Sequence, residues 1–321
     1  MLQPPIDTNI LWTLTPGQFL ETSKIIFNWQ AVHNPVYKQW VALNKSTAIP
    51  FLPISFFKTQ DVFIGAKPMH LFESSGTTQD VKSNHWVQNL SLYEASFLEG
   101  FKLFYGDPSK YCIIGLLPSY LERKHSSLVY MVDKLIKASG HTESGFYLDD
   151  FVKLNEVLQN LEKQKKPVWF IGVSFALTDF AIAFPQQLKS TIVLETGGMK
   201  GRKEELTRNE LHQLLTDNLG VASIHSEYGM TELLSQAYSQ KNGRFYCPPW
   251  MKISIQDPGD PQQWFGHEKT GRICIIDLAN VYSCSFIATD DLGKTHEDGS
   301  FEVLGRIDFS DLRGCNQLVI D

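Results

Sequence analysis

Short apolar runs alternate with longer amphipathic stretches between residues 111 and 224, and this alternation limits the chain to few folds. Three of the apolar runs have the length of buried strands: 111–117, 168–175 and 190–195. The intervening stretches carry apolar residues at helical spacing and are predicted as helices: 126–138, 147–165 and 179–188. Strands that alternate with helices form βαβ units around a parallel sheet. We therefore predict a doubly wound α/β fold.

The ends of the chain differ from this regular middle. Thr207 and Glu210 form a capping box, with Leu211, Leu214 and Leu215 behind it, so a further helix starts there. After Tyr246 the pattern changes to short strands separated by turn signals. The first seventy residues are rich in aromatic residues and prolines and predict short helices and loops. We predict an α/β body over residues 1–245, with an irregular part at 1–70, and a β-rich portion over 246–321.

Composition excludes several classes of protein. A chain that is 43% hydrophobic and 20% charged is too balanced for a disordered protein, a collagen-like fibre or a coiled coil. No apolar run is long enough to span a membrane, and Met1-Leu-Gln-Pro-Pro5 does not resemble a secretion signal, so we expect a cytoplasmic protein. The 29 basic and 35 acidic residues are mixed along the chain, which gives no electrostatic support for nucleic-acid binding. Five widely spread cysteines indicate neither a disulfide framework nor a zinc site.

Four polar segments carry residues suited to chemistry. The segment 72–82 places four hydroxyl side chains around one glycine, so its backbone N–H groups and hydroxyls could bind an anion such as phosphate. The segment 226–232 follows the apolar run 220–224 and ends in a carboxylate, at the edge where open α/β sheets bind ligands. The segments 286–293 and 305–308 place acids and an arginine in predicted turns. Taken singly, the segment 72–82 would more often be a polar surface turn, and the segments 286–293 and 305–308 would each be interpreted as a β-turn.

The order of these segments resembles the signatures of the adenylate-forming superfamily of acyl-CoA synthetases, phenylacetate-CoA ligases and related enzymes. The matching motifs are Ser74-Ser-Gly-Thr-Thr78, Tyr228-Gly-Met-Thr-Glu232, Thr289-Asp-Asp-Leu-Gly293 and Gly305-Arg-Ile-Asp308. Within that superfamily the chain is most similar to the acyl-protein synthetase (LuxE-like) branch. The resemblance implies the fold of the superfamily's N-terminal domain, with doubly wound sheets and a small β-rich portion. It also leads us to expect that the mobile C-terminal domain of full-length members is absent.

The resemblance implies a role for each matched residue. The loop that holds the ATP phosphates would contain Ser74, Ser75, Gly76, Thr77, Thr78 and Lys82, although Gln79 and Val81 depart from the usual glycine and proline. Glu232 would hold Mg²⁺, Tyr228 would stack on adenine, and Asp291 would accept hydrogen bonds from the ribose. The remaining nucleotide contacts would be Gly229, Thr231, Arg306, and Gly197 and Gly198 beside Met199. Apart from the matched motifs, His225 and His125 are candidate polar contacts near the acyl carboxylate, although a lone histidine is more often a structural residue.

The reaction implied is attack of a carboxylate on the α-phosphate of ATP, which needs positioning and charge neutralisation but no catalytic base. Acyl-protein synthetases of this type pass the acyl group to a cysteine near their C-terminus, and Cys315 occupies a comparable place. Its thiolate is a competent acceptor. Coenzyme A is the alternative acceptor. The resemblance further implies a fatty acid as substrate and an acyl-accepting protein, a reductase, as partner.

Two other classes remain open on the sequence alone. Gly172-Val-Ser174-Phe-Ala176 lies between a strand and a helix, as the nucleophile elbow of a serine hydrolase would, with Asp290 and His296 following in order. A binding protein that keeps the fold without turnover is the second alternative. The sequence identifies neither the acid nor the oligomeric state.

Overall fold

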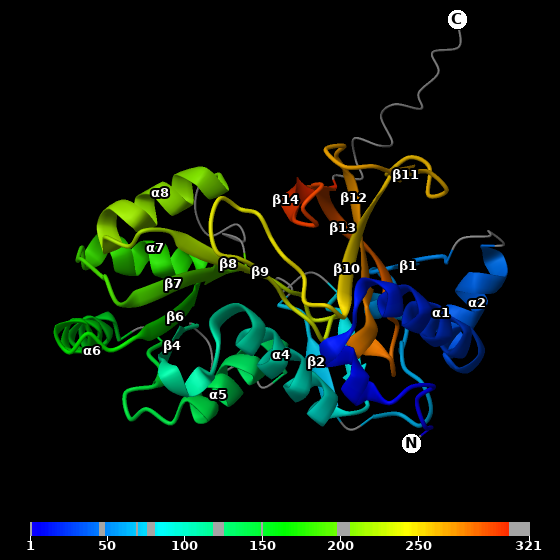
Figure 1. Cartoon of the computed structure of the whole chain (residues 1–321), viewed down its shortest axis with the longest axis horizontal. Coiled ribbons are helices and arrows are strands. Elements are labelled where there is room, and N and C mark those ends of the chain that lie inside the picture. Colours follow the sequence, from blue (N-terminus) through cyan, green and yellow to red (C-terminus); the bar gives the residue numbers. More distant parts are fainter. Residues whose placement is uncertain are drawn as a thin grey trace, which may run out of the picture.

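The computed structural model describes residues 2–44, 49–68, 70–75, 81–117, 125–148, 150–197 and 206–307. These residues form two lobes, one built on a parallel sheet and the other on a mainly antiparallel sheet (Figure 1). The helices are α1 (Pro16–His33), α2 (Pro35–Leu43), α3 (Phe56–Thr59), α4 (Leu90–Tyr105), α5 (Ser127–Ser139), α6 (Phe151–Lys163), α7 (Ser174–Ala183) and α8 (Arg208–Leu219). Three short 3₁₀ turns are η1 (Thr8–Thr13), η2 (Pro108–Lys110) and η4 (Leu278–Asn280).

The parallel sheet has the order β5-β4-β6-β7-β8-β9. Its strands are β4 (Cys112–Leu116), β5 (Gly145–Phe146), β6 (Val168–Val173), β7 (Thr191–Thr196), β8 (Ile224–Tyr228) and β9 (Ala237–Ser239). All neighbours are parallel except β9, which runs antiparallel to β8. β4 and β6 are almost wholly buried because both faces of the sheet are covered, which explains their continuous apolar sequences.

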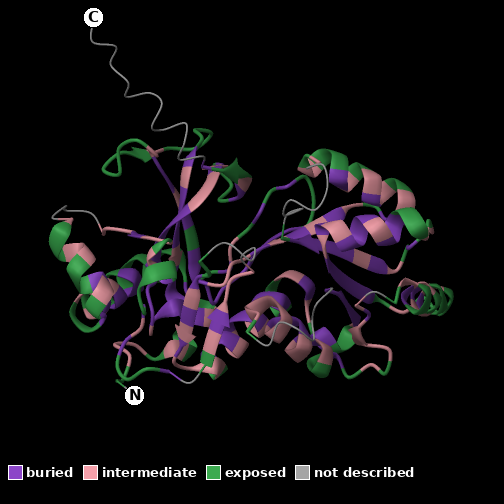
Figure 2. Cartoon of the chain, turned by 180° about the vertical axis from the view of Figure 1, so that it is seen from behind, coloured by how far each residue is buried: buried purple, intermediate pink, exposed green. Residues whose placement is uncertain are grey.

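Helices cover this sheet on two sides. On one side, Ile113 and Trp169 pack in a core cluster with α4 and α5. On the other side, Ile114 and Phe170 pack with apolar residues of α6, α7 and α8. Successive strand residues alternate between the two clusters, as the period of a strand requires. Figure 2 shows the buried strands between helices whose outer faces are exposed. The predicted doubly wound α/β fold is therefore confirmed.

The second lobe is built on a sheet with the order β1-β13-β12-β10-β11, and β14 pairs with the far part of β13. Its strands are β1 (Leu52–Pro53), β10 (Met251–Gln256), β11 (Trp264–Phe265), β12 (Gly271–Asp277), β13 (Phe286–Thr295) and β14 (Phe301–Arg306). β1 is parallel to β13 and the other pairs are antiparallel. A separate hairpin consists of β2 (His70–Glu73) and β3 (Asn84–Val87).

The N-terminal helices pack against this second sheet. Phe27 of α1 and Tyr37 of α2 both contact the ring of Phe286, at centroid distances of 6.0 Å each. Gln30 donates from Nε2 to the backbone carbonyls of Asn280 (3.1 Å) and Val281 (2.7 Å). The first part of the chain thus contains an 18-residue helix and joins the β-rich portion through hydrogen bonds and ring contacts. The division of the chain at residue 245 stays a prediction.

Most predicted elements lie within a few residues of the observed ones, and the capping box at Thr207 is present. Two predictions were wrong. The helix expected at 179–188 begins at Ser174 and ends at Ala183, because Pro185 cannot continue it. The segments around Asp291 and Gly305, expected as turns, lie on the paired strands β13 and β14. Among the described residues, no helix combines the length and the apolar character that crossing a bilayer requires.

Candidate functional site

Tyr228, Asp291 and Arg306 meet where the two sheets approach each other. The Tyr228 hydroxyl at the end of β8 donates to Asp291 Oδ2 at 2.8 Å. Arg306 lies opposite Asp291 in the β13–β14 register, and its Nε is 3.4 Å from Asp291 Oδ1. Burial raises the pKa of Asp291, whereas Tyr228 and Arg306 act to lower it. The Tyr228 ring packs edge-on against Phe301 at 5.5 Å, so it is held in place.

Glu232 lies beside this group. Its side chain is buried, and burial raises the pKa of its carboxyl group, while the Ser83 hydroxyl donates a hydrogen bond to it. Arg306 and Lys58 both attract the carboxylate electrostatically. Lys58, Thr59, Gln60, Asp61 and Asn84 line a polar cavity of about 430 Å³, and Asn84 directly follows Ser83. The buried Glu232 carboxylate thus accepts a hydrogen bond from Ser83 and is attracted by two cationic side chains.

The base of the hydroxyl-rich loop lies next to Glu232 through Ser83. Ser83 N donates to Ser74 Oγ at 2.9 Å, and Ser74 N donates to the Ser83 carbonyl at 3.0 Å. Lys82 forms an ion pair with Glu73 at 3.3 Å. Ser74, Ser75 and Lys82 are described, whereas the candidate residues Gly76, Thr77 and Thr78 lie outside the described residues. The structure thus brings the two ends of the predicted phosphate loop beside the predicted metal-binding carboxylate.

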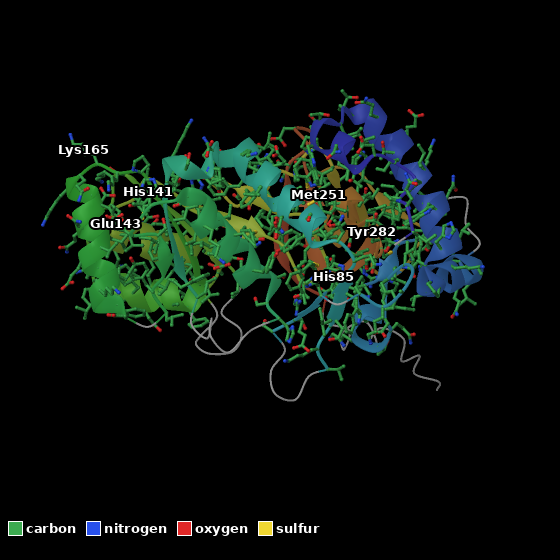
Figure 3. The ribbon with its side chains drawn as sticks, turned by 90° about the horizontal axis from the view of Figure 1, so that it is seen from below. His85, His141, Glu143, Lys165, Met251 and Tyr282 are labelled. Atoms are coloured by element: carbon green, nitrogen blue, oxygen red, sulfur yellow. The ribbon has the colours of Figure 1, made fainter. Side chains whose placement is uncertain are left out.

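Side chains from two other elements hold the backbone of this turn. His85 on β3 donates from Nδ1 to the Thr231 carbonyl at 2.7 Å. Asn280 in η4 donates from Nδ2 to the Glu232 carbonyl at 2.7 Å. Burial lowers the pKa of His85 to about 4, although its contacts with Thr231 and Asn280 act to raise it. Figure 3 shows His85 near Tyr282 in this lobe, far from His141, Glu143 and Lys165.

The glycine turn after β7 is held by Ser174. Gly197 has a φ of +64°, a conformation that favours glycine, and its carbonyl accepts from Ser174 Oγ at 2.8 Å. Ser174 Oγ is also 3.1 Å from Glu195 Oε2. Burial acts to raise the pKa of Glu195, but hydrogen bonds from His212 and Ser226 bring it below the ordinary value. Gly198 and Met199 lie outside the described residues.

A partly buried carboxyl group links this turn to the next motif. The Glu227 side chain accepts a hydrogen bond from the Thr196 hydroxyl, and burial raises the pKa of Glu227 to about 7. A Cβ added to Gly229 would lie 2.3 Å from Glu227 Oε1. Only glycine therefore fits at position 229 as long as the Glu227 side chain has this conformation.

The two candidate histidines lie in different surroundings. His225 Nδ1 is 3.3 Å from the Tyr105 hydroxyl, and the two rings stack at 5.8 Å. Burial, aided by His212, lowers the pKa of His225 to about 4. His125 instead lies beside the β2–β3 hairpin, where its Nδ1 is 3.1 Å from the Leu71 carbonyl. The structure thus places His225 beside α4 and His125 beside the β2–β3 hairpin, and their contact with an acyl carboxylate stays a prediction.

The cysteines fall into two groups. Cys112, Cys274 and Cys284 are buried, and burial raises the pKa of each thiol, as expected for packing residues. Cys247 is half-buried, and its thiol pKa is raised for the same reason. Cys315 lies outside the described residues.

The serine-hydrolase alternative fails on geometry. Ser174 Oγ contacts Glu195 and the Gly197 carbonyl. His296, the expected base, is hydrogen-bonded through Nε2 to Glu302 at 2.8 Å and through Nδ1 to Glu268 in the other lobe. No triad forms, because the expected base and nucleophile belong to different sheets.

The comparisons with known proteins identify the family. A model of the family described as acyl-protein synthetase, LuxE, matches residues 122–321. The chain belongs to the LuxE acyl-protein synthetase family. This match contains the Tyr228 motif, Asp291 and Arg306, whose side chains meet in the structure. No curated protein matches the sequence.

Solved structures with the same fold are adenylate-forming enzymes. ATP-bound MatB from Rhodopseudomonas palustris has a TM-score of 0.55 at 14% identity, over 74% of this chain and 47% of that one. O-succinylbenzoate coenzyme A synthetase from Bacillus subtilis, in complex with ATP and magnesium, has a TM-score of 0.51 at 17% identity, over 74% and 49%. A long-chain-fatty-acid-CoA ligase from Archaeoglobus fulgidus has a TM-score of 0.54 at 14% identity, over 77% and 53%. The chain spans about half the length of these structures and shares the fold of an adenylate-forming domain.

The donor set around Glu232 fits Mg²⁺. This ion is commonly held by one or two carboxylates together with substrate phosphates. Within the described part of the chain no group of three or more His, Cys, Asp or Glu side chains forms a metal cage. The single Glu232 carboxylate beside the hydroxyl-rich loop therefore suits a Mg²⁺ ion whose other ligands include substrate phosphates. Our sequence reasoning did not include Lys58, Ser83, His85 or Asn280, because their role depends on contacts between segments far apart in the chain.

Proposed function

We propose that this family member activates a carboxylic acid with ATP and passes the acyl group to a thiol, with Cys315 as the first acceptor. The observation that carries the proposal is the convergence of Glu232, Ser83, Asp291, Arg306 and Tyr228. They come from segments far apart in the sequence and meet beside the base of the hydroxyl-rich loop.

In the first step an oxygen of the ionised acid attacks the α-phosphorus of ATP. A P–O bond to the acid forms, the P–O bond to the β-phosphate oxygen breaks, and pyrophosphate leaves with the electron pair. Lys82, Arg306 and the loop residues Ser74 and Ser75 would orient the phosphates. Glu232 would hold Mg²⁺, which when bound supplies charge neutralisation on the phosphates. Asp291 would bind the ribose and Tyr228 would fix that carboxylate.

In the second step a thiolate attacks the acyl carbonyl carbon, a thioester forms, and AMP leaves. Cys315 is proposed as this thiolate because of its place in the sequence, and coenzyme A is the competing acceptor. We propose a fatty acid as the substrate and an acyl-accepting protein, such as a reductase, as the partner. The family assignment and the likeness to a fatty-acid ligase fold support these choices.

The test of the first step is exchange of labelled pyrophosphate into ATP, with fatty acids of several lengths and a few aromatic acids. Exchange that depends on both an acid and Mg²⁺ is the expected result. A folded protein that binds ATP but shows no exchange with any acid would instead be a non-catalytic relative.

The test of the second step is intact mass after incubation with ATP and the acid that stimulates exchange. One added acyl group, released by hydroxylamine and absent from Cys315→Ser, is expected. Cys247→Ser serves as the matched control and should still be acylated. Formation of acyl-coenzyme A without a protein adduct would assign the acceptor role to coenzyme A.

A further inference from the structure

His85 and Asn280 form a buried clamp on the turn that carries Glu232. His85 Nδ1 is 2.7 Å from the Thr231 carbonyl, which can only accept, so Nδ1 carries a proton and donates it. Asn280 Nδ2 donates to the carbonyls of Glu232 (2.7 Å) and Cys284 (3.0 Å). Two consecutive carbonyls of the turn are therefore fixed by two side chains from different segments.

The two clamp residues also lie in contact with each other. His85 Nε2 lies 3.1 Å from Asn280 Oδ1. Because both N–H groups of the Asn280 amide point at carbonyls, its oxygen must face His85. The relative exposed area of either residue is 1%. The His85 ring also packs edge-on against Phe57 at 5.6 Å, which leaves it little freedom to turn.

The same strand region holds the other end of Glu232. Ser83 and His85 are both buried, with Asn84 between them partly exposed, as expected for alternating residues of an extended chain. Ser83 contacts the Glu232 carboxylate, and His85 contacts the carbonyl of the preceding residue. Asn280 is anchored in turn by Gln30, which donates to its carbonyl at 3.1 Å.

The turn is held beyond Glu232 as well. Asp277 Oδ2 accepts from Leu234 N at 2.8 Å and from Ser235 N at 3.0 Å. The backbone on either side of Glu232 is therefore held by hydrogen bonds to buried side chains. Such outer contacts orient metal-binding carboxylates and their loss commonly weakens metal binding about 10- to 100-fold.

We propose that His85 and Asn280 are positioning residues that hold the Glu232 carboxylate at the place where Mg²⁺ and phosphate bind. This proposal rests on the proposed function for the identity of the ligand. It assigns His85 no contact with substrate; His85 acts only through the backbone of Thr231 and Glu232.

Two substitutions of His85 separate this role from a loss of folding. In His85→Asn the side-chain amide nitrogen takes the place of Nδ1 and can still donate to Thr231. In His85→Gln the amide reaches the place of Nε2 and leaves the Thr231 carbonyl without its donor. Both are polar, both are smaller than or close to histidine in size, and both lose the ring contact with Phe57.

The measurement is ATP binding by the whole chain as a function of Mg²⁺ concentration, with pyrophosphate exchange alongside. We expect His85→Gln to need about tenfold more Mg²⁺ for half-maximal ATP binding, while His85→Asn stays close to wild type. Asn280→Ala should behave like His85→Gln. The KM for the acid should not change. His296→Gln, which alters a buried histidine outside this turn, serves as the control and should keep the wild-type dependence.

The possible outcomes separate the two proposals. Equal Mg²⁺ dependence of folded His85→Gln and His85→Asn would overturn the clamp. Mg²⁺-dependent ATP binding that His85→Gln weakens, in a protein that catalyses no exchange, would keep the clamp and overturn the proposed activity. Wild-type protein that binds ATP without regard to Mg²⁺, or does not bind it, would overturn the clamp.

Discussion

Tyr228 at the end of the parallel sheet donates its hydroxyl proton to Asp291 on the antiparallel sheet across 2.8 Å. This bond joins the two lobes at the point where the nucleotide is proposed to bind. Each residue also orients a neighbour, because the tyrosine fixes the carboxylate and the carboxylate keeps one oxygen facing Arg306.

Tyr228→Phe tests this bond. A hydrogen bond to a buried carboxylate is worth about 2 kcal/mol, and its loss leaves Asp291 with Arg306 alone. We expect ATP binding to weaken by about tenfold or more, with a lower melting temperature. Titration calorimetry with ATP measures the first effect and thermal unfolding the second. Unchanged affinity would mean that Asp291 is oriented without Tyr228.

Glu232→Gln should separate activity from stability. Burial raises the pKa of Glu232, so the charged form is disfavoured in the folded chain, and a neutral amide of the same shape should not lower the melting temperature. Loss of the charge should reduce Mg²⁺-dependent exchange about a hundredfold. If activity and melting temperature fell together, the carboxylate would be a structural residue and not a metal ligand.

Glu227 should make stability depend on pH. Its carboxyl pKa is about 7 in the folded chain against an ordinary 4.5, so the folded state binds more protons between these values. The resulting stabilisation is fully present below pH 4.5 and is lost as the pH rises through 7, a difference of about 3 kcal/mol.

Glu227→Gln mimics the protonated acid at every pH and removes this dependence. Relative to wild type, its free energy of unfolding in urea should therefore increase from about pH 5 to about pH 8. The partly exposed Glu99 forms an ion pair with Lys102, and Glu99→Gln provides the control. A constant difference between Glu227→Gln and wild type across this range would show that Glu227 has an ordinary pKa.

Lys58→Ala should weaken phosphate binding modestly. The side chain is exposed and lines the polar cavity, so its attraction for phosphate is screened by solvent. We expect the KM for ATP to rise about two- to fivefold, and less at high salt. Lys102→Ala, which removes a surface lysine paired with Glu99, should have no effect on this KM. Equal effects of both substitutions would point to net charge alone.

Gly229→Ala should destabilise the fold through a steric clash with Glu227, and shortening the Glu227 side chain should relieve that clash. The new methyl group would lie 2.3 Å from Glu227 Oε1, and overpacking of this kind costs about 1–3 kcal/mol. In a Glu227→Ala background the same change should cost much less. A double-mutant cycle on unfolding free energies measures this coupling, and additive effects would mean that the clash is not the cause.

The sequence predicted the middle of the fold well because its signals are local. The apolar run at β4 and the capping box at Thr207 each specify structure within a few residues. The turns expected around Asp291 and Gly305 were wrong because pairing between β13 and β14 overrode the local preference of Asp and Gly. The resemblance of the ordered motifs to those of a known superfamily was enough to group Tyr228, Glu232, Asp291 and Arg306.

The residues that support this group could not be found in the same way. His85 and Asn280 are separated by 195 positions, and each looks like an ordinary polar residue in its own segment. Their roles arise only when η4 and β3 reach the same turn. Ser83 and Lys58 were missed for the same reason, since both act on Glu232 from segments far from it in the sequence.

The attachment of α1 and β1 to the β-rich lobe has a consequence for how the chain is made. β1 at 52–53 pairs with 287–288, and Gln30 contacts 280, 281 and 285. A ribosome therefore releases the partners of the first helix only after strands β4 to β9 are complete. Until those partners are synthesised, α1 would remain in a partly folded state with apolar surface exposed. Aggregation competes with folding in such states. A fragment starting at residue 122, where the family match begins, would lack Gln30 and His85 and leave Asn280 without either partner.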